Sequence, residues 1–102
     1  MKAHDQQTQE MVTRARRELY RAFAVLDSES DVRGFLLDLC TPAEIEAMAD
    51  RWRVVPLLKQ GVPYREIHDR TGVSVTTVGR VARFLESGNG GYEAVYAKLY
   101  DS

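Results

Sequence analysis

The chain has 102 residues, 44% of them hydrophobic and 28% charged, and a formal net charge of −1. A domain of this length buries only about two-thirds of the surface that its unfolded chain exposes, so helices that share a core between two chains are expected. Cys40 is the only cysteine, which excludes an intrachain disulfide framework and a cysteine-rich zinc site. No segment has the apolar length of a signal peptide or a membrane span, so we expect no membrane partner and a cytoplasmic location.

The first forty residues predict two helices. Residues 1–8 are polar and lack periodicity, and we expect a flexible N-terminus there. A helix is predicted over residues 9–27, because apolar residues recur at spacings of 3 and 4 and keep one face against a partner helix: Val12, Ala15, Leu19, Ala22 and Leu26. A partner helix in a second subunit is favoured over one in the same chain. A short second helix is predicted after Ser28, with Val32, Phe35, Leu36 and Leu39 as its apolar face.

A third helix is predicted to begin at Pro42. Thr41 is a suitable N-cap, Pro42 suits the first helical position, and Glu44 completes a capping box. Apolar residues follow at helical spacing up to a stop at Gly61, and Trp52 among them is expected in the core. Pro56 lies inside this pattern, so a kink or a local shift is expected there.

The remaining sequence predicts three short helices. Two of them cover residues 64–71 and 74–86 and are joined by Gly72 and Val73, while a glycine-rich run over 87–91 precedes a final amphipathic helix that starts at Tyr92. No strand pattern and no internal repeat is present. The prediction is therefore an all-α fold in which residues 9–102 form a single multi-helix domain.

Residues 63–86 fit a helix-turn-helix. Such a motif needs apolar residues where two helices cross, a residue that tolerates positive φ in the turn, and a second helix with a polar, cationic outer face. Ile67, Val78 and Val81 supply the crossing, Gly72 the turn, and Ser74 the N-cap of the second helix. Residues 51–83 also carry a net charge of +5 in a chain of net charge −1, so a basic stripe on an acidic body is expected. The alternative is a plain helical hairpin with solvated arginines.

This motif predicts double-stranded DNA as the partner. The side chains expected at the DNA are Lys59, Tyr64, Arg65, Ser74, Thr76, Thr77, Gly79, Arg80 and Arg83. Phosphate contacts from Lys59, Arg65 and the helix N-termini are expected to set the position of the protein. The threonines and the two arginines of the second helix are expected to read base edges, and Gly79 permits close backbone approach.

Three stretches of sequence together resemble the Trp repressor (TrpR) superfamily. They are the run Leu39-Cys40-Thr41-Pro42-Ala43-Glu44-Ile45 continuing to Arg53, the pattern Ile67…Gly72…Ser74…Thr77-Val78-Gly79-Arg80, and the tail from Leu85 to Tyr92. The tail is similar to that of the YerC/YecD group within this superfamily. The resemblance implies a TrpR-like helical bundle, intertwined as a homodimer, with two recognition helices in successive major grooves.

The resemblance also bears on ligand control. Arg51 and Arg80 stand where two arginines flank the bound indole in the tryptophan repressor, so they are a possible ligand site. Val81 and Phe84 stand where the repressor has a glycine and a serine, and we expect their bulk to fill the space and remove a hydroxyl partner. Binding of L-tryptophan is therefore not expected, and any effector is left open. If Arg80 faces a ligand cavity, it cannot also be a main base reader.

The predicted function is a sequence-specific DNA-binding transcriptional regulator, repressor-like and not responsive to tryptophan. The alternative is a dimeric helical interaction module that acts on a protein partner without specific DNA binding. An enzyme is not expected, because the sequence has no nucleophile and base pair, no metal cluster and no phosphate loop after a strand. No metal and no cofactor are expected for the same reasons.

Overall fold

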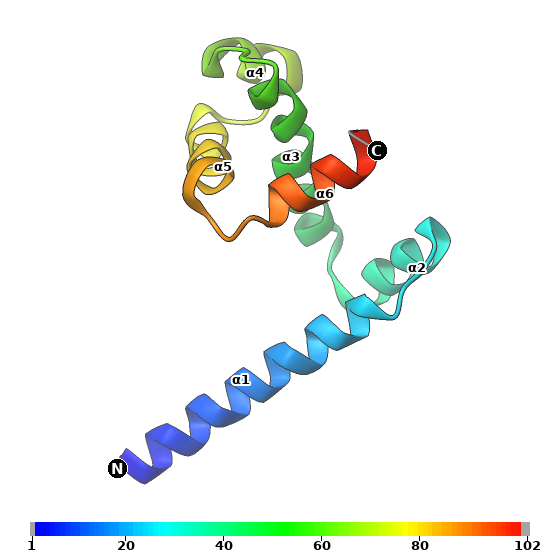
Figure 1. Cartoon of the computed structure of the whole chain (residues 1–102), viewed down its shortest axis with the longest axis vertical. Helices are drawn as coiled ribbons and strands as arrows, with labels where there is room; N and C mark the ends of the chain where they lie inside the picture. The colour runs from blue at the N-terminus through cyan, green and yellow to red at the C-terminus, as the bar shows by residue number, and fades with distance from the viewer. Residues whose placement is uncertain (1, 101–102) are drawn as a thin grey trace. The chain divides into compact units, whose positions relative to one another are not determined.

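The computed structural model describes residues 2–100, and all regular structure in that range is α-helical, which confirms the predicted fold class. The helices are α1 (Lys2–Ala24), α2 (Glu29–Leu39), α3 (Pro42–Lys59), α4 (Tyr64–Thr71), α5 (Val75–Ser87) and α6 (Gly91–Tyr100) (Figure 1). They form two compact units, residues 1–41 and residues 42–102, called here the N-terminal unit and the C-terminal unit.

The N-terminal unit consists of α1 and α2. α1 begins at Lys2 rather than Gln9, so the helix runs through residues that the sequence predicted to be flexible. Glutamines and glutamate are good helix formers, and Gln6 and Glu10 add a hydrogen bond of 3.4 Å one turn apart. α2 begins as predicted, because the Ser28 hydroxyl accepts a 3.0 Å hydrogen bond from the backbone of Asp31.

The apolar side chains of the N-terminal unit have little cover. Among the side chains described there, from residue 5 to residue 41, none is buried. Phe23 and Phe35 meet edge to face with ring centroids 5.1 Å apart, yet Phe23 stays 37% exposed and Leu19 38% exposed. This unit has no core of its own, and the single domain over residues 9–102 stays a prediction.

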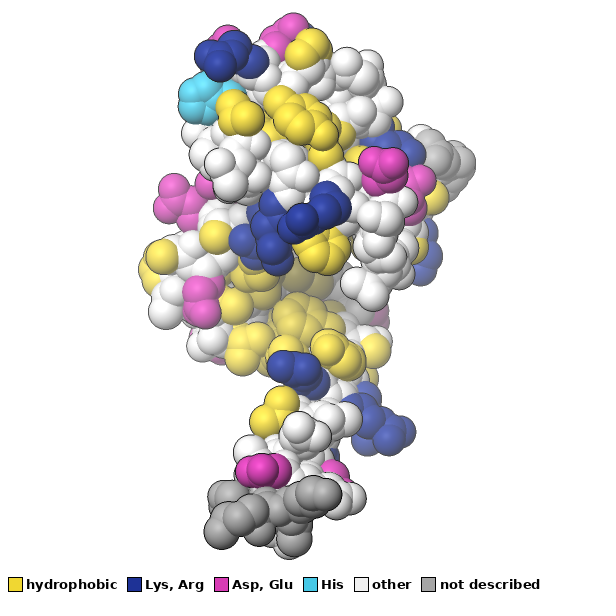
Figure 2. Space-filling model, turned by 90° about the vertical axis from the view of Figure 1, so that its left-hand side faces the viewer, with side chains coloured by type: hydrophobic (Ala, Val, Ile, Leu, Met, Phe, Trp, Pro, Cys, Tyr) yellow, Lys and Arg dark blue, Asp and Glu magenta, His cyan; other side chains and the backbone are white. Residues whose placement is uncertain are grey.

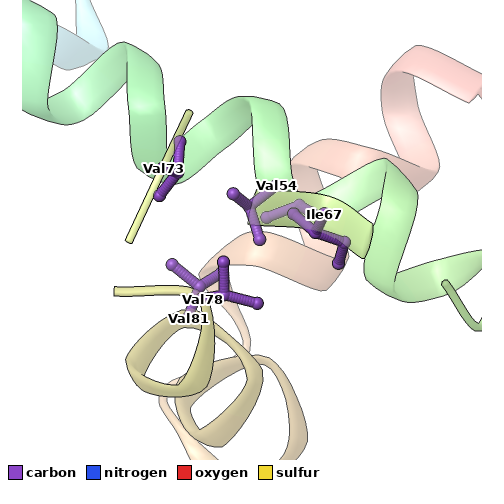
Figure 3. Packing of buried hydrophobic residues seen from close by; sticks show 6 residues of the cluster. Val54, Ile67, Val73, Val78 and Val81 are labelled. Carbon is purple, nitrogen blue, oxygen red and sulfur yellow. The ribbon is translucent and has the colours of Figure 1, made fainter. Parts of the chain in front are cut away.

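The C-terminal unit is built on a core of small branched side chains. Its fully or almost fully buried residues are Val54, Val55, Ile67, Val73, Val78 and Val81. Figure 3 shows Val78 and Val81 pointing from α5 toward Val54 of α3 and Ile67 of α4. α3 begins at Pro42, as the capping box predicted, and continues past Pro56 to its last residue, Lys59.

The turn between α4 and α5 is closed by local hydrogen bonds. Gly72 ends α4 in the left-handed region, at φ +79°, and its backbone N–H donates to the carbonyl oxygen of His68 at 2.8 Å. The Thr71 hydroxyl donates to the Ile67 carbonyl at 2.7 Å and accepts from the backbone of Val73 at 3.1 Å. These contacts fix the directions in which α4 and α5 leave the turn.

The last helix returns to α3. The Lys59 ammonium lies 2.6 Å from a carboxylate oxygen of Glu93 and 5.1 Å from the centre of the Tyr96 ring. Trp52 of α3 stacks on Tyr92 of α6 with ring centroids 6.3 Å apart. These contacts, made at the middle and at the last residue of α3, hold α6 beside the buried core.

Candidate nucleic-acid interface

α5 presents its polar side chains on the face opposite the valine core. Val78 and Val81 are buried, whereas Thr76, Arg80 and Arg83 are exposed. Figure 2 looks onto the side of the molecule where α5 lies in Figure 1, and shows Lys and Arg side chains gathered there against a hydrophobic side chain. The burial pattern matches the outward positions expected for Thr76, Arg80 and Arg83.

The start of α5 is organised by Ser74. Its hydroxyl accepts a 3.1 Å hydrogen bond from the backbone N–H of Thr77 and donates a 3.0 Å hydrogen bond to the Thr77 side-chain oxygen. Ser74 and Thr77 are therefore partly engaged with each other, and Thr77 is half-buried. Thr76 is the threonine that stands exposed at this helix end.

The start of α4 lies against the middle of α5. Tyr64 is 45% exposed, and Arg65 beside it is also exposed. A Cβ atom built on Gly79 would lie 3.9 Å from the Tyr64 ring, which is ordinary van der Waals contact. Tyr64 and Gly79 therefore belong to one continuous surface, with Arg65 next to it in the chain.

Lys59 differs from the other residues expected at the DNA. Its ammonium is held by Glu93 and by the face of the Tyr96 ring, so it helps attach α6 to α3. The sequence could not indicate this role, because Glu93 is far away along the chain and no local pattern connects the two.

The arginines of α5 share an aromatic partner. The guanidinium carbon of Arg80 lies 5.0 Å from the centre of the Phe84 ring, and that of Arg83 lies 5.7 Å from it. Both distances are within the roughly 6 Å range in which a cation is attracted to a ring face. Sequence reasoning missed this contact, although Arg80 and Phe84 are one helical turn apart and could have suggested it.

A cleft of about 520 Å³ lies beside α5 in the C-terminal unit. It is lined by Arg51, Trp52, Arg80, Phe84, Asn89, Gly91, Tyr92 and Val95. The fold thus brings Arg51 and Arg80 to one cleft. Phe84 forms part of the wall and Val81 is buried in the core, and the expectation that their bulk fills the space for a ligand stays a prediction.

Trp52 packs against the core as expected, and both it and the glycine-rich segment line the cleft, which the sequence did not predict. Trp52 is half-buried, packs against the core and also lines the cleft. Asn89 and Gly91, which belong to the glycine-rich run of residues 87–91, are part of the same lining. Both placements depend on how α6 folds back, and periodicity along one helix carries no information about that.

The described residues contain neither a membrane span nor a metal cluster. From residue 2 to residue 100, no helix is both long enough and apolar enough to cross a membrane. Among the side chains described from residue 5 to residue 100, no three residues of the types histidine, cysteine, aspartate and glutamate come together in a way that would hold a metal ion.

The C-terminal unit is helical and places a capped, cationic helix beside a cleft lined by two arginines. The family described as Trp repressor protein matches residues 12–100, and the chain belongs to this family. Within it the chain is of the YerC type, as the resemblance of the tail predicted.

Three relatives support this placement. The uncharacterized protein YerC of Bacillus subtilis (strain 168) is 37% identical over 85 residues, which cover 83% of this chain and 82% of YerC. The crystal structure of a TrpR-like protein from Eubacterium eligens ATCC 27750 has a TM-score of 0.80 at 33% identity and covers 89% of this chain and 94% of its own. That of a candidate Trp repressor from Staphylococcus aureus has a TM-score of 0.77 at 34% identity, covering 83% and 85%.

Proposed function

We propose that the protein is a dimeric, sequence-specific DNA-binding transcriptional regulator of the repressor type, in which α4 and α5 form a helix-turn-helix. The observation that carries this proposal is the exposed, cationic face of α5, held on a buried valine core by a capped turn. Membership of the Trp repressor family supports it.

The residues at the surface divide into two roles. The first backbone N–H groups of α5 and the Arg65 guanidinium contact phosphates, because a helix N-terminus and a cation both favour an anion. Thr76, Arg80 and Arg83 face base edges in the major groove. There arginine pairs with guanine, and the threonine hydroxyl can hydrogen-bond to more than one type of base. Lys59 contributes less than expected from the sequence, since its ammonium is engaged by Glu93.

A second copy of the chain covers the N-terminal unit in this proposal. The apolar stripe of α1 keeps Val12 at 44%, Leu19 at 38% and Phe23 at 37% exposure. A 23-residue helix with so regular a stripe gains stability mainly by burying that stripe. A dimer buries it and pairs the two α5 helices for half-sites about one helical turn apart.

The cleft supports an additional role as an effector site. Its volume of about 520 Å³ lies in the range of small-molecule pockets, and its wall combines two guanidinium groups with aromatic rings. A place in a ligand cavity was expected to exclude a main role in base reading, but Arg80 belongs to both the cleft wall and the exposed face of α5. In this proposal it reads bases from the exposed face, and an occupant of the cleft would change the DNA-binding face directly. The identity of such an effector is not part of the proposal.

The proposal is tested by the salt dependence of binding to a mixed-sequence duplex. The affinity should fall steeply with salt as counterions are released, and the Arg65→Ala variant, which loses a phosphate contact, should lower the slope of log K against log salt by about 1. Arg70→Ala is the matched control, because its guanidinium is already paired with Glu66 on α4, and it should leave the slope nearly unchanged. Absence of duplex binding at low salt by an intact dimer would favour the protein-interaction module instead.

A further inference from the structure

We propose that Phe84 is a positioning residue that holds the Arg80 and Arg83 guanidinium groups in place for DNA. This inference rests on the proposed function and adds a residue that does not itself contact bases. It starts from the geometry of one ring and two cations: the guanidinium carbons lie 5.0 Å and 5.7 Å from the ring centre.

Phe84 takes the place of an acidic partner for these arginines. Among the side chains described from residue 5 to residue 100, the ion pairs join Lys59 to Glu93 and Arg70 to Glu66, and neither involves Arg80 or Arg83. An aromatic ring attracts a cation without neutralising its charge. The two guanidinium groups therefore keep their full charge for an anionic partner while their side chains are held in place.

Such holding matters because a free arginine loses rotamer freedom when it binds. Arg80 and Arg83 both lie on the exposed face of α5, where no packing against the core restricts them. Contact with a ring restricts them before DNA arrives, so less conformational entropy is lost on binding. The gain in affinity should be larger for specific binding, which needs a defined direction of each guanidinium group, than for non-specific binding to phosphates.

Phe84 has no competing duty in the core. Its side chain is 39% exposed, whereas the valines on the other face of α5 are buried. Truncating its ring therefore removes the two cation contacts and leaves the packing of α5 intact. Phe84→Leu keeps apolar volume without a ring, and Phe84→Tyr keeps the ring, so the two variants separate the aromatic contact from bulk.

The test compares these variants with the wild-type dimer on two duplexes, the site selected from a random library and a mixed sequence. Phe84→Leu should bind the selected site about tenfold more weakly, with a smaller loss on the mixed duplex, and Phe84→Tyr should restore the affinity. In the absence of DNA, the arginine Nε–H resonances of residues 80 and 83 should lose their ring-current shifts in Phe84→Leu alone. The unfolding midpoint should stay close to that of the wild type.

Three results would overturn this role. Wild-type or tighter binding by Phe84→Leu would show that the ring does not help the arginines. Equal losses on both duplexes together with a lower unfolding midpoint would show a merely structural role. Failure of Phe84→Tyr to restore affinity would show that the ring contact is not what matters. If the wild-type protein selects no site at all, the proposed function fails first, which is a distinct outcome.

Discussion

The Nδ1 atom of His68 lies 2.8 Å from the carbonyl oxygen of Val73, across the turn that joins α4 to α5. A carbonyl oxygen only accepts, so the ring nitrogen is the donor. Val73 is buried in the core, and the hydrogen bond therefore ties an exposed residue of α4 to the core residue of the turn. His68 thus helps to close the turn between α4 and α5.

Replacing His68 by alanine should lower the free energy of unfolding by about 1 kcal/mol, the usual net contribution of one hydrogen bond. Urea denaturation of the two proteins measures this difference. Asp69→Ala truncates the neighbouring exposed residue and should change the free energy by less than about 0.5 kcal/mol. Equal effects of the two substitutions would show that the histidine contact contributes nothing.

Gly79→Ala should separate stability from DNA binding. Alanine favours the interior of a helix over glycine by about 1 kcal/mol, and its methyl group would meet the Tyr64 ring at an ordinary contact distance of 3.9 Å. The variant should therefore unfold at a higher denaturant concentration. It should bind the selected duplex more weakly, because the added methyl group stands where α5 approaches the bases. A variant that gains stability and keeps full affinity would place Gly79 away from the DNA.

A charge in the apolar stripe of α1 should abolish the dimer. Leu19→Asp would bury an unpaired carboxylate between subunits, at a cost of several kcal/mol, about 3 or more. Light scattering during gel filtration should then give the mass of a single chain. Thr13→Asp introduces the same side chain away from that stripe and should remain dimeric. If Leu19→Asp keeps the dimer mass, the α1 stripe is not the subunit interface.

L-tryptophan should not bind at micromolar concentrations. The cleft is open enough to admit a small molecule, but Phe84 occupies the wall position from which the resemblance implies a hydroxyl partner. A ligand whose polar group is left without a partner in a partly enclosed site loses much of its affinity. Isothermal titration calorimetry measures this directly. Heats of binding that give a micromolar dissociation constant would contradict the expectation.

Local signals in the sequence predicted the helices well. Ser28 and Ser74 cap α2 and α5 at the positions expected, Gly72 adopts the positive φ that the turn needs, and α3 starts at Pro42. Each of these features depends on hydrogen bonds or dihedral angles within a few residues. The start of α1 was predicted too late, because the spacing of apolar residues gives no signal where the first turns of a helix consist of polar residues.

The functional surface was predicted less completely, for a physical reason. The outward positions on α5 follow from helical spacing, and so the exposed arginines were found. The cleft joins Arg51 and Trp52 of α3 to Tyr92 of α6, and the ion pair of Lys59 with Glu93 joins the same two helices. Such relationships depend on tertiary packing. Phe84 was assigned to filling space because its bulk was visible in the sequence and its contact with two cations was not.

The most direct test of the central claim is selection of binding sites from a random duplex library with the purified protein at about 150 mM salt, where non-specific contacts are already weakened. The account predicts enrichment of a palindrome whose half-sites lie about one helical turn apart. On that site Arg80→Ala should then weaken binding by about 1–3 kcal/mol. A dimer that enriches no sequence, and binds all duplexes alike, would contradict a role as a sequence-specific regulator.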